Sequence, residues 1–109
     1  MTTVLAADLG GTTTKAALVS SDGELLAEAS VPAPAPGISG LILPLDWWNG
    51  FREAAAMLKA ENEVAFLAIE AIAVTGVTRT PVVLDSLGNS LAGAIPARDT
   101  RAHEIAARS

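Results

Sequence analysis

Cysteine is absent from the 109-residue sequence, and basic residues are scarce. Without cysteine, the chain can form neither a disulfide framework nor a thiolate metal site. Seven Lys and Arg residues stand against twelve Asp and Glu, and the formal net charge is −5. This balance argues against a nucleic-acid backbone as a partner. No apolar run reaches the length needed to cross a bilayer, so a membrane partner is not expected either.

The first residues also lack the basic segment and long apolar run of a secretory signal. A cytoplasmic location is therefore expected. Half of the residues are apolar, which predicts a folded core rather than disorder. The length allows at most one small domain, or a part of one.

A glycine-rich turn between two apolar segments is the most informative stretch, VLAADLGGTTTKAALVS at residues 4–20. Gly10 and Gly11 are expected to allow a sharp turn with positive φ, and they leave no Cβ in front of an incoming group. Three threonines follow and add hydroxyl donors to the backbone N–H groups, the donor set of an anion-binding nest. Asp8 precedes the turn, where a carboxylate beside phosphates needs a cation such as hydrated Mg²⁺ between them. An ordinary hairpin turn fits the same residues, and both interpretations stand at this point.

The hydrophobic pattern predicts a three-stranded antiparallel meander at the start of the chain. Strands are expected at residues 4–9, 15–20 and 25–31, and an Asp-Gly pair marks the second turn. The first strand is apolar on both faces and is expected at the centre of the sheet. Alternate prolines at 32–37 predict an extended connector, with a Pro-x-x-Pro ligand as the weaker alternative.

A helix is expected next, over residues 47–63, with Asp46 as its N-cap. Its apolar stripe is expected to contain Trp48, Phe51, Ala55 and Leu58. The two tryptophans fit core positions, and a sugar-stacking platform is the alternative.

A buried strand is expected at residues 68–75, a β-hairpin at 82–95, and the start of a helix at 102. Three strands, a helix and a strand are the opening of a ribonuclease-H-like domain, the fold of actin-like ATPases. We therefore predict an α/β fold of this type, N-terminal part only. Ligands of open α/β sheets gather at the strand ends, where Asp8 and the loop after Gly76 are expected to meet.

Four segments resemble the FGGY family of carbohydrate kinases, which contains xylulokinases and glycerol kinases. DLGGTTTKAALV at 8–19 is similar to the family's first phosphate motif, and Asp46-Trp47-Trp48 resembles its helix start. IEAIAVTG at 69–76 is similar to the strand that usually ends in Ser/Thr-Gly-Gln. VVLDSLGNSLAGAIPARDTRA at 82–102 is similar to the hairpin that leads into Asp-x-Arg.

The resemblance implies transfer of the ATP γ-phosphoryl group to a sugar or polyol hydroxyl, with Mg²⁺ as cofactor. It implies contact with Mg²⁺ through water for Asp8. The implied phosphate ligands are Gly10, Gly11, Thr12, Thr13 and Lys15, and the implied substrate contacts are Thr78, Arg79 and Asp99. For three of these residues a structural role remains the alternative: Lys15 and Arg79 as solvated side chains, and Asp99 as a brace for a neighbouring arginine.

The sequence also departs from the family pattern at several positions. Gly11 stands where the family usually has threonine, and Val77 replaces a common glutamine. Thr78 and Arg79 differ from the familiar substrate-contacting pairs, and Ala97 replaces a frequent tryptophan. The resemblance therefore leaves the sugar open.

Residues 1–109 are expected to be a partial N-terminal kinase domain whose partner is the C-terminal portion of the same kinase. The family's catalytic base and second domain come from that portion, so the chain alone is expected to be inactive. An incomplete sheet is expected to expose an edge and apolar surface, which favours self-association or marginal stability. Two alternatives are a ROK-type or other actin-like kinase, suggested by Gly10-Gly11-Thr12, and a non-catalytic nucleotide-binding module.

Overall fold

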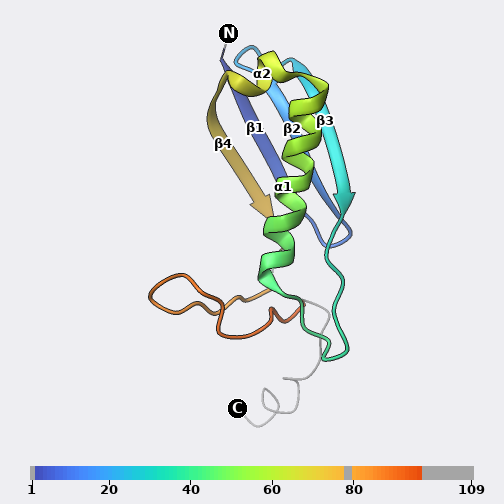
Figure 1. Ribbon diagram of the computed structural model, residues 1–109, viewed down its shortest axis with the longest axis vertical. Helices are drawn as coiled ribbons and strands as arrows, with labels where there is room; N and C mark the ends of the chain where they lie inside the picture. The colour runs from blue at the N-terminus through green and yellow to red at the C-terminus, as the bar shows by residue number, and fades with distance from the viewer. Residues whose placement is uncertain (1, 78–79, 97–109) are drawn as a thin grey trace. The chain divides into compact units, whose positions relative to one another are not determined.

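The computed structural model describes residues 2–77 and 80–96 of the chain (Figure 1). Its backbone forms two compact units. The first unit comprises Met1–Pro34 and Leu45–Val77. The second unit comprises Ala35–Pro44 and the residues after Val77.

Four strands of the first unit form one mixed sheet in the order β3-β2-β1-β4. The antiparallel meander is confirmed as β1 (Thr3–Leu9), β2 (Thr13–Ser20) and β3 (Leu25–Pro32). β4 (Ile69–Gly76) pairs with β1 in parallel. β1 therefore has a neighbour on each side, which confirms the central position predicted from its two apolar faces.

Two helices replace the single helix expected from the sequence. α1 (Pro44–Glu61) begins at a proline, which suits a first helical turn because the missing N–H has no intrahelical partner there. Asp46 lies inside that first turn, so the prediction that it is the N-cap is wrong. The helix ends before Asn62, whose side-chain Oδ1 accepts the N–H of Ala65 at 3.1 Å and caps α2 (Glu63–Leu67).

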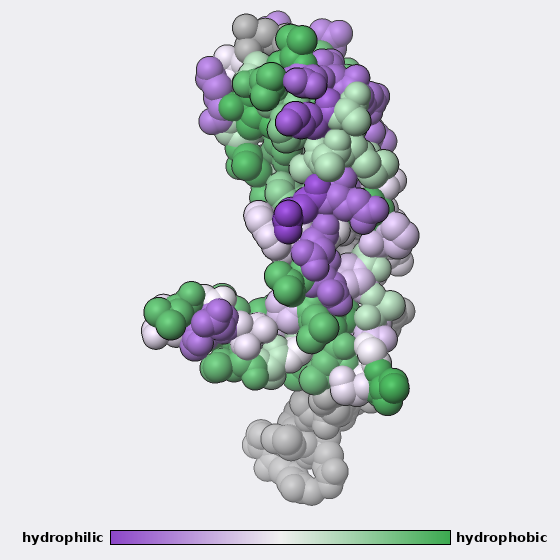
Figure 2. Space-filling model, in the orientation of Figure 1, coloured by the Kyte–Doolittle hydropathy of each residue, from purple (hydrophilic) through white to green (hydrophobic). Residues whose placement is uncertain are grey.

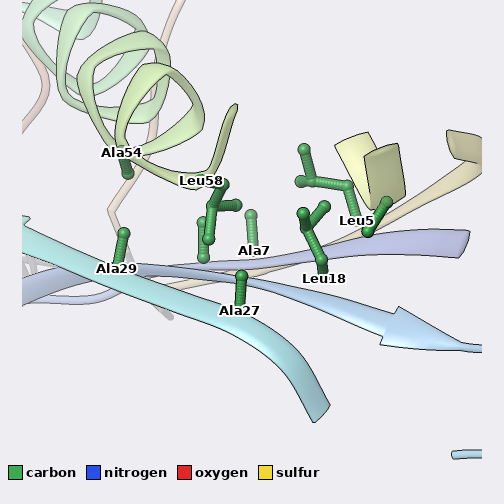
Figure 3. Close-up of a cluster of buried hydrophobic side chains, with 9 residues drawn as sticks. Leu5, Ala7, Leu18, Ala27, Ala29, Ala54 and Leu58 are labelled. Carbon is green, nitrogen blue, oxygen red and sulfur yellow. The ribbon is translucent and has the colours of Figure 1, made fainter. Parts of the chain in front are cut away.

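The hydrophobic core lies between α1 and one face of the sheet (Figure 3). Ala54 and Leu58 of α1 are fully buried and point toward small side chains of the strands, among them Ala27 and Ala29. Alanines on the sheet let the helix approach closely, and burial of Leu58 contributes about 1.5–3 kcal/mol. The predicted stripe is partly wrong, because Trp48 is 54 % exposed while Ala54 takes the core position.

Hydrophilic side chains cover the face of α1 that is turned away from the sheet (Figure 2). They include Asn49, Arg52, Glu53 and Lys59, all exposed. The helix is therefore amphipathic, with one face packed and one face in water.

β4 differs from the other strands because α1 does not cover it. Ile72 and Val74 share the helix-facing side with Leu5 and Ala7, their partners on β1. Even so, they are 59 % and 60 % exposed. The strand predicted at residues 68–75 is therefore confirmed, but the prediction that it is buried is wrong. The second edge of β4 has no neighbouring strand in the sheet. An apolar strand with one free edge is a template for pairing with another chain.

The second unit is held by isolated backbone pairs rather than by a regular hairpin. Leu84 and Ser90 form one antiparallel bridge, and Ile42 and Ala94 form another. The turn between Leu84 and Ser90 is ordered by Asp85, whose Oδ1 accepts the N–H groups of Leu87 and Asn89 at 2.9 Å. The hydrogen bond from the Asn89 backbone is the main cause that lowers the pKa of Asp85. The hairpin predicted at 82–95 is thus confirmed only around its turn.

Among the described residues, none of the helices is both long and apolar enough to cross a membrane.

One prediction concerns the buried hydroxyl of Thr14, which is fully inaccessible and has no hydrogen-bond partner. Thr14→Val removes a desolvated polar group at nearly constant volume, so we expect a gain of about 1 kcal/mol in unfolding free energy. Denaturant unfolding measures the change. Thr12→Val, at an exposed position, serves as control and should change stability by less than about 0.5 kcal/mol. A loss of stability in Thr14→Val would contradict this account of the core.

A second prediction concerns the uncovered side of β4. We expect the 109-residue chain to self-associate at high concentration, and Val74→Lys to weaken this association because a charge on an edge strand opposes pairing. Sedimentation velocity over a concentration series measures both effects. Met57→Lys, on the outer surface of α1, is the matched control and should leave association unchanged. A wild-type chain that stays monomeric at all concentrations would refute the prediction.

Candidate functional site

The candidate site lies where β1 and β4 end. Because these strands run in parallel, their carboxyl ends meet at one edge of the sheet. The glycine-rich turn follows β1 at this edge, and Val77 follows β4. The N–H of Val77 donates to the carbonyl of Leu9 at 3.1 Å and extends the pairing by one step. The predicted meeting of the two segments is confirmed.

Backbone hydrogen bonds fix both ends of the turn. The N–H of Gly10 donates to the carbonyl of Thr13 at 3.0 Å. The carbonyl of Thr12 accepts the N–H of Ala33, just after β3, also at 3.0 Å. Within the described part of the chain, the N–H groups of Gly11 and Thr12 donate to no protein acceptor. Two adjacent N–H groups without a protein acceptor are the kind of donors that an anion-binding nest uses.

Gly10 and Gly11 are not among the glycines with positive φ, so the expectation of positive φ at this turn is wrong. The space around the two glycines differs. A Cβ on Gly10 would lie 2.5 Å from the carbonyl oxygen of Thr13, so no other residue fits without a shift of the turn. A Cβ on Gly11 would meet only Val77, with 3.6 Å to its Cγ1, which is an ordinary contact. Gly11 therefore has room for a side chain, whereas Gly10 does not.

The three threonine side chains differ in burial, so the expectation that all three hydroxyls are accessible beside the turn is wrong. Thr12 is exposed and Thr13 is half-buried. Thr14 is fully buried on the helix-facing side, where a Cβ on Gly50 would lie 3.8 Å from its Oγ1. Of the three hydroxyls, only those of Thr12 and Thr13 remain accessible to a ligand.

Two opposite charges lie beside the turn on the side of the sheet away from α1. Asp8 and Lys15 are Cα partners on β1 and β2, and both are exposed. Thr75 is the partner of Asp8 on β4. No ion pair joins Asp8 and Lys15 in the described structure, so both remain available to a ligand and its counter-ion.

Asp8 fits a hydrated cation but not a metal site built by the protein alone. In residues 2–77 and 80–96, no three His, Cys, Asp or Glu side chains gather in a way that could hold a metal ion. Mg²⁺ often uses one or two carboxylates together with waters and substrate phosphates. A single exposed carboxylate close to N–H groups without a protein acceptor is compatible with that mode.

The remaining candidates are the three expected substrate contacts and the tryptophan of the alternative sugar-stacking platform. Thr78, Arg79 and Asp99 lie outside the described residues. Trp48 is exposed and stacks on Phe51 with ring centroids 5.6 Å apart, so the expectation that it belongs to the core is wrong.

Two residues that hold the turn were not identified as site residues from the sequence. Ala33 contributes only its N–H, and no side-chain pattern announces such a role. In the sequence, Val77 is visible only as a departure from a family pattern. Its position directly after a strand is the signal that could identify it as a residue beside the site.

Comparison with known proteins identifies the family. Residues 3–108 match the model of the FGGY family of carbohydrate kinases, N-terminal domain. Among curated proteins, none matches the sequence.

Solved structures of sugar kinases share this fold. A structure described as a "xyloylose kinase" from Brucella ovis has a TM-score of 0.86 and 27 % identity, over 97 % of this chain and 23 % of that one. The structure of xylulose kinase from Rhodospirillum rubrum has a TM-score of 0.79 and 30 % identity, and the match covers 98 % of this chain and 23 % of that one. The structure of Plasmodium falciparum glycerol kinase with ADP is 16 % identical and therefore shows the fold alone. Its TM-score is 0.75, and the match covers 99 % of this chain and 22 % of that one.

The chain thus spans less than a quarter of the length of these relatives. A family model that covers nearly all of the sequence, together with the mixed sheet and its glycine-rich turn, leads to one assignment. The chain belongs to the FGGY family of carbohydrate kinases and corresponds to its N-terminal segment.

Proposed function

We propose that this chain supplies the phosphate-binding part of an ATP-dependent carbohydrate kinase. The observation that carries the proposal is the pair of unpaired N–H donors at Gly11 and Thr12, flanked by the accessible hydroxyl of Thr13. Lys15 adds a positive charge beside them. These groups match the terminal phosphates of ATP, which are rich in acceptors and negative charge.

In phosphoryl transfer the protein mainly positions the reactants and neutralises charge, and bound ATP supplies the transferred group. The N–H groups of Gly11 and Thr12 would hold terminal phosphate oxygens, and Lys15 would offset their charge. Asp8 would hold water molecules of the Mg²⁺ shell. These residues orient the phosphate, while the resemblance places the group that takes the acceptor proton elsewhere in the kinase.

The acceptor class that we propose is a sugar or polyol. Its support is the family assignment and the naming of relatives as xylulose, gluconate and glycerol kinases. Thr78, Arg79 and Asp99 are the proposed substrate contacts in this part of the kinase. The proposed partner is the C-terminal portion of the same kinase, and the proposed location is the cytoplasm.

The match to the FGGY family model favours this assignment over a ROK-type kinase. A non-catalytic module that binds nucleotide and nothing more differs from the kinase only in what the completed protein does. If this segment joined to a complete FGGY kinase partner region phosphorylates no sugar or polyol, while it still binds Mg-ATP, the non-catalytic role is the correct one.

A third prediction tests the phosphate site in the 109-residue chain. Magnesium tripolyphosphate should shift the amide resonances of Gly11 and Thr12 in an NMR titration. Gly10→Ala should weaken this binding about tenfold or more, because its Cβ would force the Thr13 carbonyl out of the turn. Gly50→Ala is the control, since its Cβ would make only ordinary contacts in the middle of α1.

The control should keep wild-type binding and gain up to about 1 kcal/mol of stability from the better helix propensity of alanine. Equal binding by the wild type and Gly10→Ala would show that the turn is not the phosphate site.

A fourth prediction concerns catalysis. We expect the 109-residue chain alone to transfer no phosphate from ATP to a panel of sugars and polyols at an enzyme-like rate. The reason is that the resemblance places the catalytic base in a later segment. A coupled ADP-release assay measures the rate, with Gly10→Ala purified in parallel to reveal contaminating kinase. Turnover in the wild type that is absent from the Gly10→Ala sample would refute the prediction.

A further inference from the structure

Directly after β3, the chain passes beside the glycine-rich turn. β3 pairs with β2 as far as Pro32, which lies opposite Thr13. One residue further on, the N–H of Ala33 donates to the carbonyl of Thr12 at 3.0 Å and joins the end of β3 to the turn. Within the described part of the chain, the N–H of Thr12 itself donates to no protein acceptor. Thr12 is therefore held through its carbonyl, while its N–H stays available to a ligand.

Two prolines limit the conformations of Ala33. Pro32 has a φ fixed by its ring, and Pro34 disfavours helical backbone at Ala33 because its Cδ would clash with that residue. Neither proline has an N–H, so Ala33 carries the only backbone donor of residues 32–34. A segment that is restricted before it forms its hydrogen bond loses less entropy when it does so. The Pro-Ala-Pro sequence therefore presents one donor, in a narrow range of conformations, to one acceptor in the turn.

The turn benefits from an anchor outside itself because its own residues are flexible and exposed. The N–H of Gly10 donates to the carbonyl of Thr13 at 3.0 Å, but Gly11 and Thr12, between them, are exposed. Glycine loses more conformational freedom on ordering than any other residue, and two glycines are adjacent here. N–H groups that become ordered only when a ligand binds contribute less to affinity than groups already in place. An external hydrogen bond to Thr12 reduces that cost.

We propose that Ala33 is a positioning residue for the phosphate turn: its N–H, restricted by the flanking prolines, holds the Thr12 carbonyl and pre-orders the neighbouring donors. The proposal rests on the proposed function, because those donors are assigned there to phosphate. It goes further by giving the proline segment, which the sequence predicts only as a connector, a part in phosphate affinity. Ala33 acts without touching the ligand, since its one backbone donor is already used by Thr12.

The experiment compares Ala33→Pro with Ala35→Pro in the 109-residue chain. Each substitution creates three consecutive prolines and removes one N–H. The N–H of Ala33 donates to the turn, whereas Ala35 is exposed and its N–H donates to no backbone acceptor among the described residues. Affinity for magnesium tripolyphosphate is measured by NMR titration. Ala33→Pro should weaken binding roughly three- to tenfold, within the range of one hydrogen bond, and Ala35→Pro should leave it unchanged.

A second pair of variants removes no donor and changes only the stiffness of the segment. Pro34→Ala frees the backbone of Ala33 but keeps its N–H, so it should weaken binding about threefold. Pro36→Ala is the matched control further along the same segment and should leave binding unchanged. Because Pro34→Ala places no new ring beside Thr12, it also separates loss of ordering from a steric effect of Ala33→Pro.

Hydrogen exchange separates ordering of the turn from a general loss of stability. The Gly10 amide is the reporter, because it is hydrogen-bonded inside the turn, and the Gly23 amide, bonded to Ser20 in the turn between β2 and β3, is the control. Ala33→Pro and Pro34→Ala should accelerate exchange at Gly10 and leave Gly23 unchanged. In the wild type, magnesium tripolyphosphate should slow exchange of the Ala33 amide but not of Gly23, because ligand binding and ordering are reciprocally coupled.

Equal affinities of Ala33→Pro and Ala35→Pro would overturn the proposal. Weaker binding with unchanged exchange at Gly10 would overturn it as well, because Ala33 would then act by some route other than ordering the turn. If Ala33→Pro does not fold, Pro34→Ala decides the question on the same two measurements. If the wild type binds no tripolyphosphate, the proposed function fails, and exchange at Gly10 alone then decides whether Ala33 orders the turn.

Discussion

The parallel pairing of β1 with β4 is the constraint on which the rest of the site depends. It brings residues almost seventy positions apart to one edge, because the strands end together at Leu9 and Gly76. An antiparallel partner on that side would have placed its own beginning there instead. The carbonyl of Leu9 then accepts a hydrogen bond from the N–H of Val77, which holds the end of β4 beside the start of the turn. The location of the candidate site thus depends on the topology of the sheet before it depends on side chains.

The same sheet is unequally covered, and alanine explains the close packing of the covered half. Over β1–β3, small side chains allow α1 to lie close enough for Leu58 and Ala54 to be fully buried. On β4, Ile72 and Val74 face the same direction without a helix above them. An apolar strand with both faces in water is unusual in a finished α/β sheet, where helices cover both faces of parallel strands. The proposed C-terminal portion of the kinase would provide such a cover.

Elements with a strong periodic signal were predictable, and features set by single contacts were not. The meander, the central position of β1 and the presence of a strand at β4 followed from apolar runs and turn residues, whereas the burial expected for β4 was wrong. The break at Asn62 did not, because the end of α1 and the start of α2 form one continuous helical pattern. The predicted core stripe was correct at Leu58 and wrong at Trp48 for a similar reason. Trp48 and Ala54 lie on neighbouring faces of the helix, and only packing decides which of the two side chains is buried. Thr14 shows that a polar motif residue can face the core.

The two glycines of the turn illustrate why a motif alone does not define a site. Both fit a phosphate-binding pattern, yet Gly10 is required by the nearby Thr13 carbonyl, whereas Gly11 faces free space bordered by Val77. Sequence comparison treats Gly11 and Val77 as two independent departures, one in each of two distant motifs. In the structure a Cβ on Gly11 would lie 3.6 Å from Cγ1 of Val77, so a side chain at position 11 would contact the one at position 77. A substitution that adds a side chain at position 11 should therefore be interpreted together with the residue at position 77.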